Sequence, residues 1–308
     1  MTIEVLLVGL GKIGLEYDLK NNYNLTHFNS FYRNKKFKIV GVCDTNLKKK
    51  KFFEEKKINF FSNYKEALKI LNPTVVVVST TTATHFKILK NTLKYKSVKL
   101  ILCEKPFCLN LIQARKIKFL DKFNKVYVNY MRSSDDTFYK KVIKKIKNDS
   151  NLFIEIFYKG SVLNNASHYI QLLNKYFGKC KTIQNTSKFN ANFIDFKLIF
   201  KKNIQAHFLS SNARDLFLDS MRFYTPKLII NYDNGGHLIY TSKNVLNPIY
   251  SAPNYFELKD VIKNKFYENS QKNIVTNVYK CILKKKHSLC KSAEAIEVHK
   301  IIKKIANA

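Results

Sequence analysis

Short apolar runs alternate with helical spacing over about the first 130 residues of the chain. Five runs are typical of strands: IEVLLVG from Ile3, FKIVGVCD from Phe37, TVVVVST from Thr74, VKLILCE from Val98 and KVYVNY from Lys125. Strands that are apolar along their whole length are buried on both faces, as in a parallel sheet that helices cover. This region is therefore predicted to be a doubly wound α/β domain.

The pattern changes after Tyr130. A helical segment, DTFYKKVIKKIKND, precedes the strand-like LFIEIFYKG and a second helical segment, NNASHYIQLLNKYFG. Six β-like runs then follow one another: KTIQNTSKF, ANFIDFKLIF, NIQAHFLSS, SMRFYT, KLIINYD and HLIYTS. Strands that follow strands predict an α+β domain with a mostly antiparallel or mixed sheet. We place the domains at 1–129 and 130–308, and expect the final helix, SAEAIEVHKIIKKIANA, to pack back on the first domain.

The net charge of +33 first suggests a nucleic-acid partner. However, 50 of the 55 basic residues are lysines, Asn, Ile, Phe and Tyr are plentiful, and Trp is absent, a composition typical of an A+T-rich genome. Lysine groups such as LKKKKFFEEKK are typical of the solvated face of a helix. Because helix-turn-helix, zinc-finger and RNP patterns are also missing, we expect no specific nucleic-acid partner. A structural or polyanion-binding role for the charge is the alternative.

The sequence predicts a cytoplasmic protein with no membrane partner. No apolar run approaches the ~20 residues that cross a bilayer. The opening MTIEVLLVGLG enters a strand pattern directly and lacks the features of a leader peptide. The six cysteines form no CxxC pair, so free thiols are expected and no metal site is predicted.

A glycine loop directly follows the first predicted strand. In VGLGKIG, the glycines Gly9, Gly11 and Gly14 enclose Lys12 and Ile13. After a strand and inside a βαβ unit, this spacing is the fingerprint of a Rossmann dinucleotide site. The first glycine makes the tight turn, the second admits the pyrophosphate, and the third lets helix and strand pack closely. The loop therefore predicts NAD or NADP binding.

The acid that would bind the adenosine ribose is Asp44, at the end of the second predicted strand. It follows Gly14 by thirty residues rather than the usual ~20, because the polar segment EYDLKNNYNLTH is inserted. A carboxylate there repels the 2′-phosphate of NADP, so NAD is the expected cofactor and NADP the less favoured one. Residues 48–51 are all lysines and could attract a phosphate, but we expect them to open the next helix and face solvent.

The motifs GLGKIG, VCDTN, STTTATH and CEKP come in the order and spacing of the Gfo/Idh/MocA oxidoreductases, which the chain resembles. VNYMRSSD, SHYIQLLNKYFG and SAEAIEVHKII also resemble family positions, so the resemblance spans nearly the whole chain. It implies a nicotinamide-dependent dehydrogenase or reductase of a sugar, nucleotide sugar or cyclitol. By analogy with family branches, surface-glycan sugar synthesis is a fitting setting. The resemblance also implies a homo-oligomer, a dimer or tetramer, formed through an exposed face of the C-terminal sheet.

The EKP element, Glu104 to Pro106, is the most specific part of the resemblance. It ends a predicted strand at the edge of the sheet where ligands of open α/β sheets bind. The resemblance makes Lys105 the catalytic acid–base group, because a partly desolvated lysine has a lowered pKa and can accept the hydroxyl proton. It also implies a cis Lys105–Pro106 bond, and it adds Glu104 to the cofactor site.

In the family, the loop after the third predicted strand lines the cofactor, and Ser79, Thr80, Thr81 and His85 match it. Taken alone, STTTATH is also consistent with an ordinary Thr-rich turn in which His85 caps a helix.

The substrate-domain helix departs from the family pattern D-x-G-x-H. His168 is kept, but Asn164 stands at the acid position, Ala166 at the glycine and Gln171 where another acid is common. Asparagine can hydrogen-bond a sugar hydroxyl but cannot relay a proton. The expected catalytic set is Lys105 with His168, and Asn164 as a sugar-binding group. Two alternatives stay open: a buried structural role for His168, and a non-catalytic nucleotide and sugar sensor on the same fold.

Overall fold

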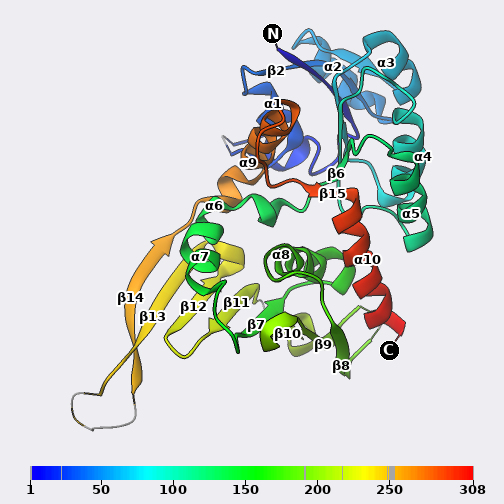
Figure 1. Cartoon of the computed structure of the whole chain (residues 1–308). Coiled ribbons are helices and arrows are strands. Elements are labelled where there is room, and N and C mark those ends of the chain that lie inside the picture. The colour runs from blue at the N-terminus through cyan, green and yellow to red at the C-terminus, as the bar shows by residue number, and fades with distance from the viewer. Residues whose placement is uncertain are drawn as a thin grey trace. The chain divides into compact units, whose positions relative to one another are not determined.

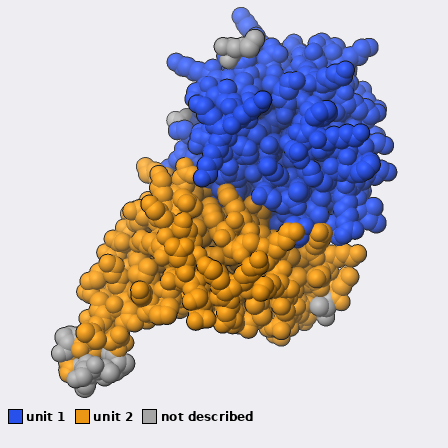
Figure 2. All heavy atoms as spheres, in the orientation of Figure 1, with its two compact units in different colours: residues 1–134, 268–299 blue, residues 135–267, 300–308 orange. Residues whose placement is uncertain are grey.

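The protein is described by a computed structural model that covers residues 2–21, 23–190, 192–216, 218–247, 249 and 254–307 (Figure 1). The chain divides into two compact units, coloured separately in Figure 2. The first unit contains residues 1–134 and 268–299, and the second contains residues 135–267 and 300–308. Relative to the predicted boundary at 129/130, the first unit runs a few residues further and takes in a late segment.

The first unit is built on a sheet whose described strands run in the order β15-β6-β5-β4-β1-β2-β3. Neighbouring strands are parallel except for β15, which runs antiparallel to β6. This confirms the predicted doubly wound parallel sheet; the short β3 and β15 were not predicted. The strands are β1 (Ile3–Val8), β2 (Phe37–Cys43), β3 (Asn59–Phe61), β4 (Val75–Val78), β5 (Leu100–Cys103), β6 (Val126–Val128) and β15 (Cys290–Lys291).

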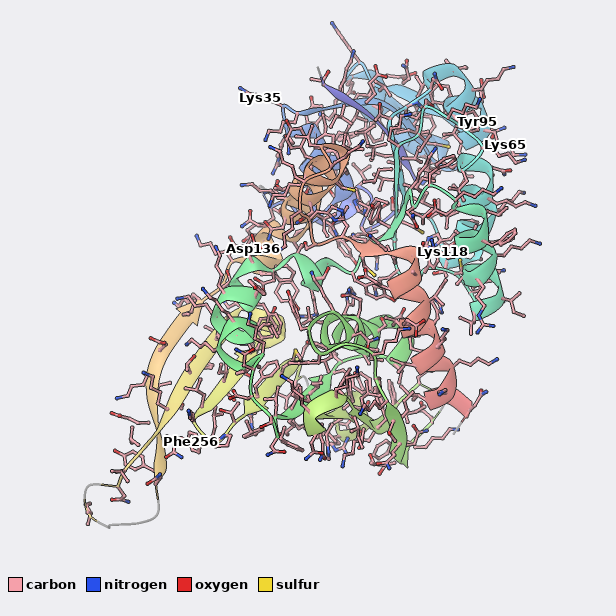
Figure 3. All side chains as sticks on the ribbon, in the orientation of Figure 1. Lys35, Lys65, Tyr95, Lys118, Asp136 and Phe256 are labelled. Atoms are coloured by element: carbon pink, nitrogen blue, oxygen red, sulfur yellow. The ribbon has the colours of Figure 1, made fainter. Side chains whose placement is uncertain are left out.

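Three helices of the first unit begin at residues whose side chains cap them. Thr26 caps α1, Asn63 caps α3 and Asn110 caps α5, each by accepting a backbone N–H. The core also takes in Ile274 and Val278 of α9, a late helix that was not predicted. The helices are α1 (His27–Tyr32), α2 (Lys50–Glu54), α3 (Tyr64–Leu71), α4 (Thr82–Thr92), α5 (Leu111–Leu120) and α9 (Phe266–Ile282). Lys35 and Lys65 lie exposed at the periphery of this unit (Figure 3).

The second unit holds a mixed sheet whose described strands run in the order β14-β13-β12-β11-β7-β10-β9-β8. Only the β7–β10 pair is parallel among these pairings, which confirms the predicted α+β class. The strands are β7 (Phe153–Tyr158), β8 (Thr182–Lys188), β9 (Ile194–Ile199), β10 (Gln205–Ser210), β11 (Ser220–Tyr224), β12 (Leu228–Asp233), β13 (Leu238–Val245) and β14 (Tyr255–Lys263).

The described residues of the second unit also form three α-helices and two π-helical turns, the first of which spans Tyr139–Ile143. The helices are α6 (Asp136–Phe138), α7 (Lys144–Ile146) and α8 (Ser167–Phe177), and the turn that leads into α8 spans Val162–Ala166. The last helix, α10 (Ser292–Asn307), contributes residues to both units. Within the described residues, no helix is long and apolar enough to span a membrane.

Candidate active site

The glycine loop leaves the end of β1 with its three glycines in different surroundings. Gly9 has φ +96°, and a Cβ on it would lie 2.6 Å from the backbone of Ser79, so the turn requires glycine. A Cβ on Gly14 would lie 2.3 Å from the carbonyl oxygen of Gly9. A Cβ on Gly11, in contrast, would meet no heavy atom of the described residues within 4 Å. The backbone around Gly11 therefore faces open space into which a ligand could approach.

Asp44 is tied to the glycine loop by direct hydrogen bonds. Its Oδ2 accepts from the N–H of Leu10 at 2.7 Å, and its Oδ1 accepts from the N–H of Asn46 at 2.8 Å. These bonds fix the carboxylate at the end of β2, and its side chain is 14% exposed. Asp44 therefore borders the loop as its predicted contact with the ribose requires.

The prediction that residues 48–51 face solvent is wrong for Lys49, which turns back over the glycine loop. Its Nζ donates to the carbonyl oxygen of Leu10, lies 2.7 Å from Glu16 Oε1, and lies 3.9 Å from Asp44 Oδ2. The two carboxylates and the carbonyl oxygen attract the ammonium at short range, and this attraction outweighs the hydration that the ammonium loses. The neighbouring Lys48 and Lys50 are exposed, as expected.

The threonine-rich loop after β4 packs on the glycine loop and on the EKP turn. Ser79 Oγ donates to the carbonyl oxygen of Gly9 at 2.8 Å, and Thr84 Oγ1 donates to Thr80 Oγ1 at 2.7 Å. His85 is fully buried inside α4, with one ring nitrogen 3.0 Å from the oxygen of Thr80 and the other 3.0 Å from that of Pro106. His85 thus connects the two loops. It is a residue of α4 itself, and the N-cap of this helix is Thr81.

A cavity of about 660 Å³ opens over the carboxyl ends of β1, β2 and β4. Its lining includes the predicted positions Gly9, Gly11, Lys12, Ile13, Asp44, Ser79, Thr80 and Thr81, and also Lys49, Tyr64 and Lys87. Three lysines beside exposed glycine backbone suit the negative charge of a pyrophosphate, and the size suits a substantial part of a dinucleotide. The other predicted cofactor-site residues, Gly14, His85, Glu104 and Lys105, are not part of this lining.

The EKP element follows β5, the strand next to β4 in the sheet. The Lys105–Pro106 peptide bond is cis. Glu104 is 8% exposed; its Oε1 lies 2.8 Å from His27 Nε2 and 2.6 Å from Asn129 Nδ2. Burial alone raises the pKa of Glu104, but hydrogen bonds and charges from His27 and its other neighbours outweigh burial and lower it overall.

Lys105 has the electrostatic setting that the resemblance implies. Burial lowers the pKa of its ammonium from the ordinary value of 10.5, and the charge of Arg132 lowers it further, while Glu104 opposes the shift. The neutral amine is therefore more accessible at physiological pH than for an exposed lysine.

The substrate-domain residues come from a single stretch of the second unit. Ser161 Oγ accepts the N–H of Asn164 at 3.2 Å and starts the π-helical turn that leads into α8. Asn164 is exposed, whereas His168 is 7% exposed and Gln171 is 2% exposed. Since Lys105 belongs to the first unit and His168 to the second, their catalytic pairing stays a prediction.

Two polar groups near these residues had no motif to reveal them. His27 contacts Glu104 from 77 positions away, so sequence spacing gives no sign of the pair. In the second unit, Asp219 accepts hydrogen bonds from Tyr169, which follows His168, and from Tyr267 at 3.3 Å. Among the residues that the structure describes, no group of three His, Cys, Asp or Glu side chains could hold a metal ion.

Comparison with known protein families finds one match. Residues 3–130 match GFO_IDH_MocA, an oxidoreductase family with an NAD-binding Rossmann fold. No curated protein matches the chain.

Solved structures match the chain from end to end at low identity. The UDP-N-acetylglucosamine 3-dehydrogenase GnnA from Acidithiobacillus ferrooxidans is 12% identical, with 100% of this chain and 98% of that chain covered and a TM-score of 0.74. A dehydrogenase from Chromobacterium violaceum is 15% identical, with 99% and 95% covered and a TM-score of 0.78. The WlbA dehydrogenase from Bordetella pertussis, solved with NADH and UDP-GlcNAcA, is 14% identical, with 99% and 95% covered and a TM-score of 0.72. At these identities the likeness shows the fold.

Proposed function

Because residues 3–130 belong to the Gfo/Idh/MocA oxidoreductase family, we propose that the protein is a nicotinamide-dependent oxidoreductase of a sugar, nucleotide-sugar or cyclitol hydroxyl or ketone. The observation that carries the proposal is Lys105, a partly buried lysine of lowered pKa at the end of the strand beside the cofactor cavity. A lysine with these properties suits acid–base catalysis at near-neutral pH.

The residues around the cavity fit a dinucleotide. The open backbone at Gly11 would admit the pyrophosphate, Lys12 would lie near its charge, and Asp44 would accept hydrogen bonds from the adenosine ribose. When bound, the nicotinamide supplies the hydride acceptor or donor. In the oxidative direction Lys105 Nζ takes the hydroxyl proton as the C–H hydride leaves and the carbonyl forms. In the reductive direction the ammonium returns that proton to the new alkoxide oxygen.

The second unit supports a sugar-type substrate. Asn164 is exposed and offers an amide donor and acceptor for hydroxyl groups, and His168 lies one helical turn further on. GnnA and WlbA, whose fold the chain shares, are described with UDP-sugars, so a nucleotide sugar of surface-glycan synthesis is the substrate class we propose first. The protein would act in the cytoplasm, where such small molecules are available.

We propose NAD rather than NADP as the cofactor. Asp44 would face the ribose hydroxyls of a bound dinucleotide, and a 2′-phosphate there would meet its negative charge. Lys49 could offset this repulsion, but its Nζ is already engaged by Glu16 and by the carbonyl oxygen of Leu10. The NADP phosphate would have to break those contacts before it gained the ammonium.

We also propose that the protein is a homo-oligomer, a dimer or tetramer, that associates through one face of the second sheet. Burial alternates along β7 and β10, so one face is packed and the other is not. The unpacked face carries Phe153, which contacts His207 and Tyr224, and Phe256 lies exposed on β14 (Figure 3). Apolar groups on an uncovered sheet face favour protein association. Light scattering of the purified protein measures the state.

The proposed activity is tested with a panel of sugars, cyclitols and nucleotide sugars, each assayed by absorbance of reduced nicotinamide. We expect turnover of at least one nucleotide sugar, lost in Lys105→Ala. A sensor on the same fold would bind NADH and a sugar without turnover, so tight binding of both with no absorbance change across the panel supports that alternative.

A further inference from the structure

The Glu104 carboxylate is the centre of a buried polar network in the first unit. Its Oε1 accepts hydrogen bonds from the side chains of both His27 and Asn129. Its Oε2 accepts a hydrogen bond from the backbone N–H of Lys105 at 3.3 Å. Asn129 in turn donates to Gln271 of α9 at 3.1 Å. A buried carboxylate stays ionised only where donors replace the water it has lost. The network supplies them from three separate elements.

The inserted segment between Gly14 and His27 delivers the histidine to this network. Asp18 is 1% exposed and accepts from the N–H groups of Leu25 and Thr26 and from Thr26 Oγ1. The segment also contacts α9, because Asn24 N–H donates to the carbonyl oxygen of Glu268 at 2.9 Å. The insertion therefore returns the chain to the glycine loop and starts α1 with His27 against Glu104.

The surroundings of His27 place a proton on Nε2, the ring nitrogen that faces Glu104. The side chain is fully buried, and its Nδ1 has no hydrogen-bond partner among the described residues. A proton on Nδ1 would be a buried donor without an acceptor, which is costly. With a proton on Nε2, the ring donates a hydrogen bond to Glu104 Oε1.

We propose that His27 is a positioning residue for catalysis: its Nε2–H holds the Glu104 carboxylate ionised and fixed beside Lys105. This inference rests on the proposed function of Lys105 as the acid–base group. The charged and titratable groups around the pair are His27, Arg132 and Cys103, besides Glu104 and Lys105 themselves. Glu104 favours the ammonium form of Lys105, and Arg132 opposes it. Loss of the His27 donor lets Glu104 take up a proton more readily, so its hold on the ammonium weakens.

The test compares His27→Leu, which removes the donor, with His27→Gln, whose amide N–H can restore it. His237→Leu, at an exposed histidine of the second unit, is the matched control. We expect His27→Leu to lower kcat about tenfold or more, the scale of one lost hydrogen bond to a charged group. The kcat of His27→Gln should recover to within about threefold of the wild-type value. In both variants the Kd for NADH should stay within about threefold of the wild-type value. Equal losses in the Leu and Gln variants would assign His27 a packing role only.

The double variant His27→Leu/Glu104→Gln separates action through Glu104 from general damage. If His27 acts through the carboxylate, the double variant loses no more kcat than Glu104→Gln alone. Multiplied losses in the double variant would overturn the proposal. Circular dichroism and NADH binding identify any variant that fails to fold. If a leucine variant does not fold, the kcat values of the single variants His27→Gln and Glu104→Gln decide the test.

A readout without turnover keeps this test apart from the proposed activity. The rate at which Lys105 is acylated by an anhydride, followed against pH by peptide mass spectrometry, reports its neutral amine. We expect the profile of Lys105 to move to lower pH in Glu104→Gln and in His27→Leu, and to stay at the wild-type position in His27→Gln. An unmoved profile in His27→Leu contradicts the inference, even where the sugar panel shows turnover. Expected shifts without turnover contradict the proposed activity alone.

Discussion

The two sheets differ in how they bury their strands, and this difference separates their tasks. Every residue of β4 and β5 is buried, so the centre of the first sheet is covered on both faces and is accessible only at strand ends. Along β10 of the second sheet, buried and partly exposed residues alternate, so one face stays available. The candidate cofactor site accordingly lies at the carboxyl ends of strands in the first sheet. The candidate association surface lies on one face of the second sheet.

The two sets of site residues differ in the same way. In the first unit, the side chains of Asp44, His85 and Glu104 each have at least two hydrogen-bond partners, and at least one of these comes from another loop or strand. In the second unit, Asn164 and His168 come from one local turn, and Asn164 is exposed. The candidate groups of the first unit therefore converge from segments far apart in the chain, whereas those of the second unit lie close together in sequence.

Replacing the acid–base group of the first unit should have the largest effect. We expect Lys105→Ala to lower kcat by about 10² to 10⁴, the usual range for general acid–base catalysis, with NADH binding largely intact. Lys99→Ala removes an exposed lysine just before the same strand and is the matched control. Steady-state rates on the true substrate measure both; an unchanged rate in Lys105→Ala would remove it from the mechanism.

Changes in the second unit should cost less. His168→Ala is expected to lower kcat by about a hundredfold, at the lower end of acid–base effects, through proton transfer and positioning. Asn164→Ala should cost less than either Lys105→Ala or His168→Ala, because an amide contributes only hydrogen bonds to a hydroxyl. Rates of the three variants under one set of conditions give the order. A loss in Asn164→Ala that exceeds the loss in His168→Ala would reverse the roles assigned to the turn.

The glycine loop offers a change that separates ligand binding from folding. Because a side chain at Gly11 meets open space, Gly11→Leu should fold normally and weaken NADH binding more than tenfold by occupying the pyrophosphate position. Gly14→Ala should instead destabilise the fold, since its Cβ would collide with the carbonyl of Gly9. Fluorescence titration with NADH and thermal unfolding measure the two effects. If folded Gly11→Leu binds NADH as tightly as wild type, the site lies elsewhere.

The pH profile should reflect the lowered pKa of Lys105. In the oxidative direction the amine must be unprotonated, so kcat/KM is expected to rise with pH through an apparent pKa below 10.5, the ordinary lysine value. In the reductive direction kcat/KM falls through the same range, because the ammonium is then the required form. A profile in which both directions rise with pH would show that another group carries the proton.

Cofactor preference should show the smallest effect of single changes. We expect NADH to bind more tightly than NADPH, and Asp44→Ala to narrow the difference by removing the repulsion. Lys49→Ala should alter the ratio by less than about threefold, since the Lys49 ammonium is already engaged by Glu16 and by the carbonyl oxygen of Leu10. Competition titrations at physiological ionic strength measure the ratio. Tight NADPH binding that Lys49→Ala abolishes would show that the lysine outweighs the carboxylate.

The sequence predicted the parts of the fold that local pattern determines. The apolar runs at Ile3, Phe37 and Thr74 are strands because continuous Val, Ile and Leu suit a sheet buried on both faces. The strand β14 was missed because YFELKDVIK mixes charged and apolar residues on an exposed edge, where no face is fully buried. The helix α9 was missed among Asn-rich residues, although Ile274 and Val278 occupy the core.

In the candidate site, the positions of the glycine loop, Asp44 and Lys105 could be predicted from the sequence. Each of them lies just after the carboxyl end of a strand in the first sheet. Two contacts join residues more than thirty positions apart in the sequence. These are the contact of Lys49 with Glu16 and the contact of His27 with Glu104. Such contacts depend on tertiary packing, which no local motif encodes.

The inserted segment before α1 also bears on how much a Rossmann domain can lengthen its first connection. Closing a longer loop costs conformational entropy that grows only logarithmically, ~0.6 kcal/mol for each doubling of length. The excess here over the usual spacing, about ten residues, is well short of a doubling. One buried acceptor such as Asp18, with three donors from the segment itself, is enough to offset that cost. The glycine fingerprint can therefore tolerate insertions at this point wherever the added residues order themselves around one buried carboxylate.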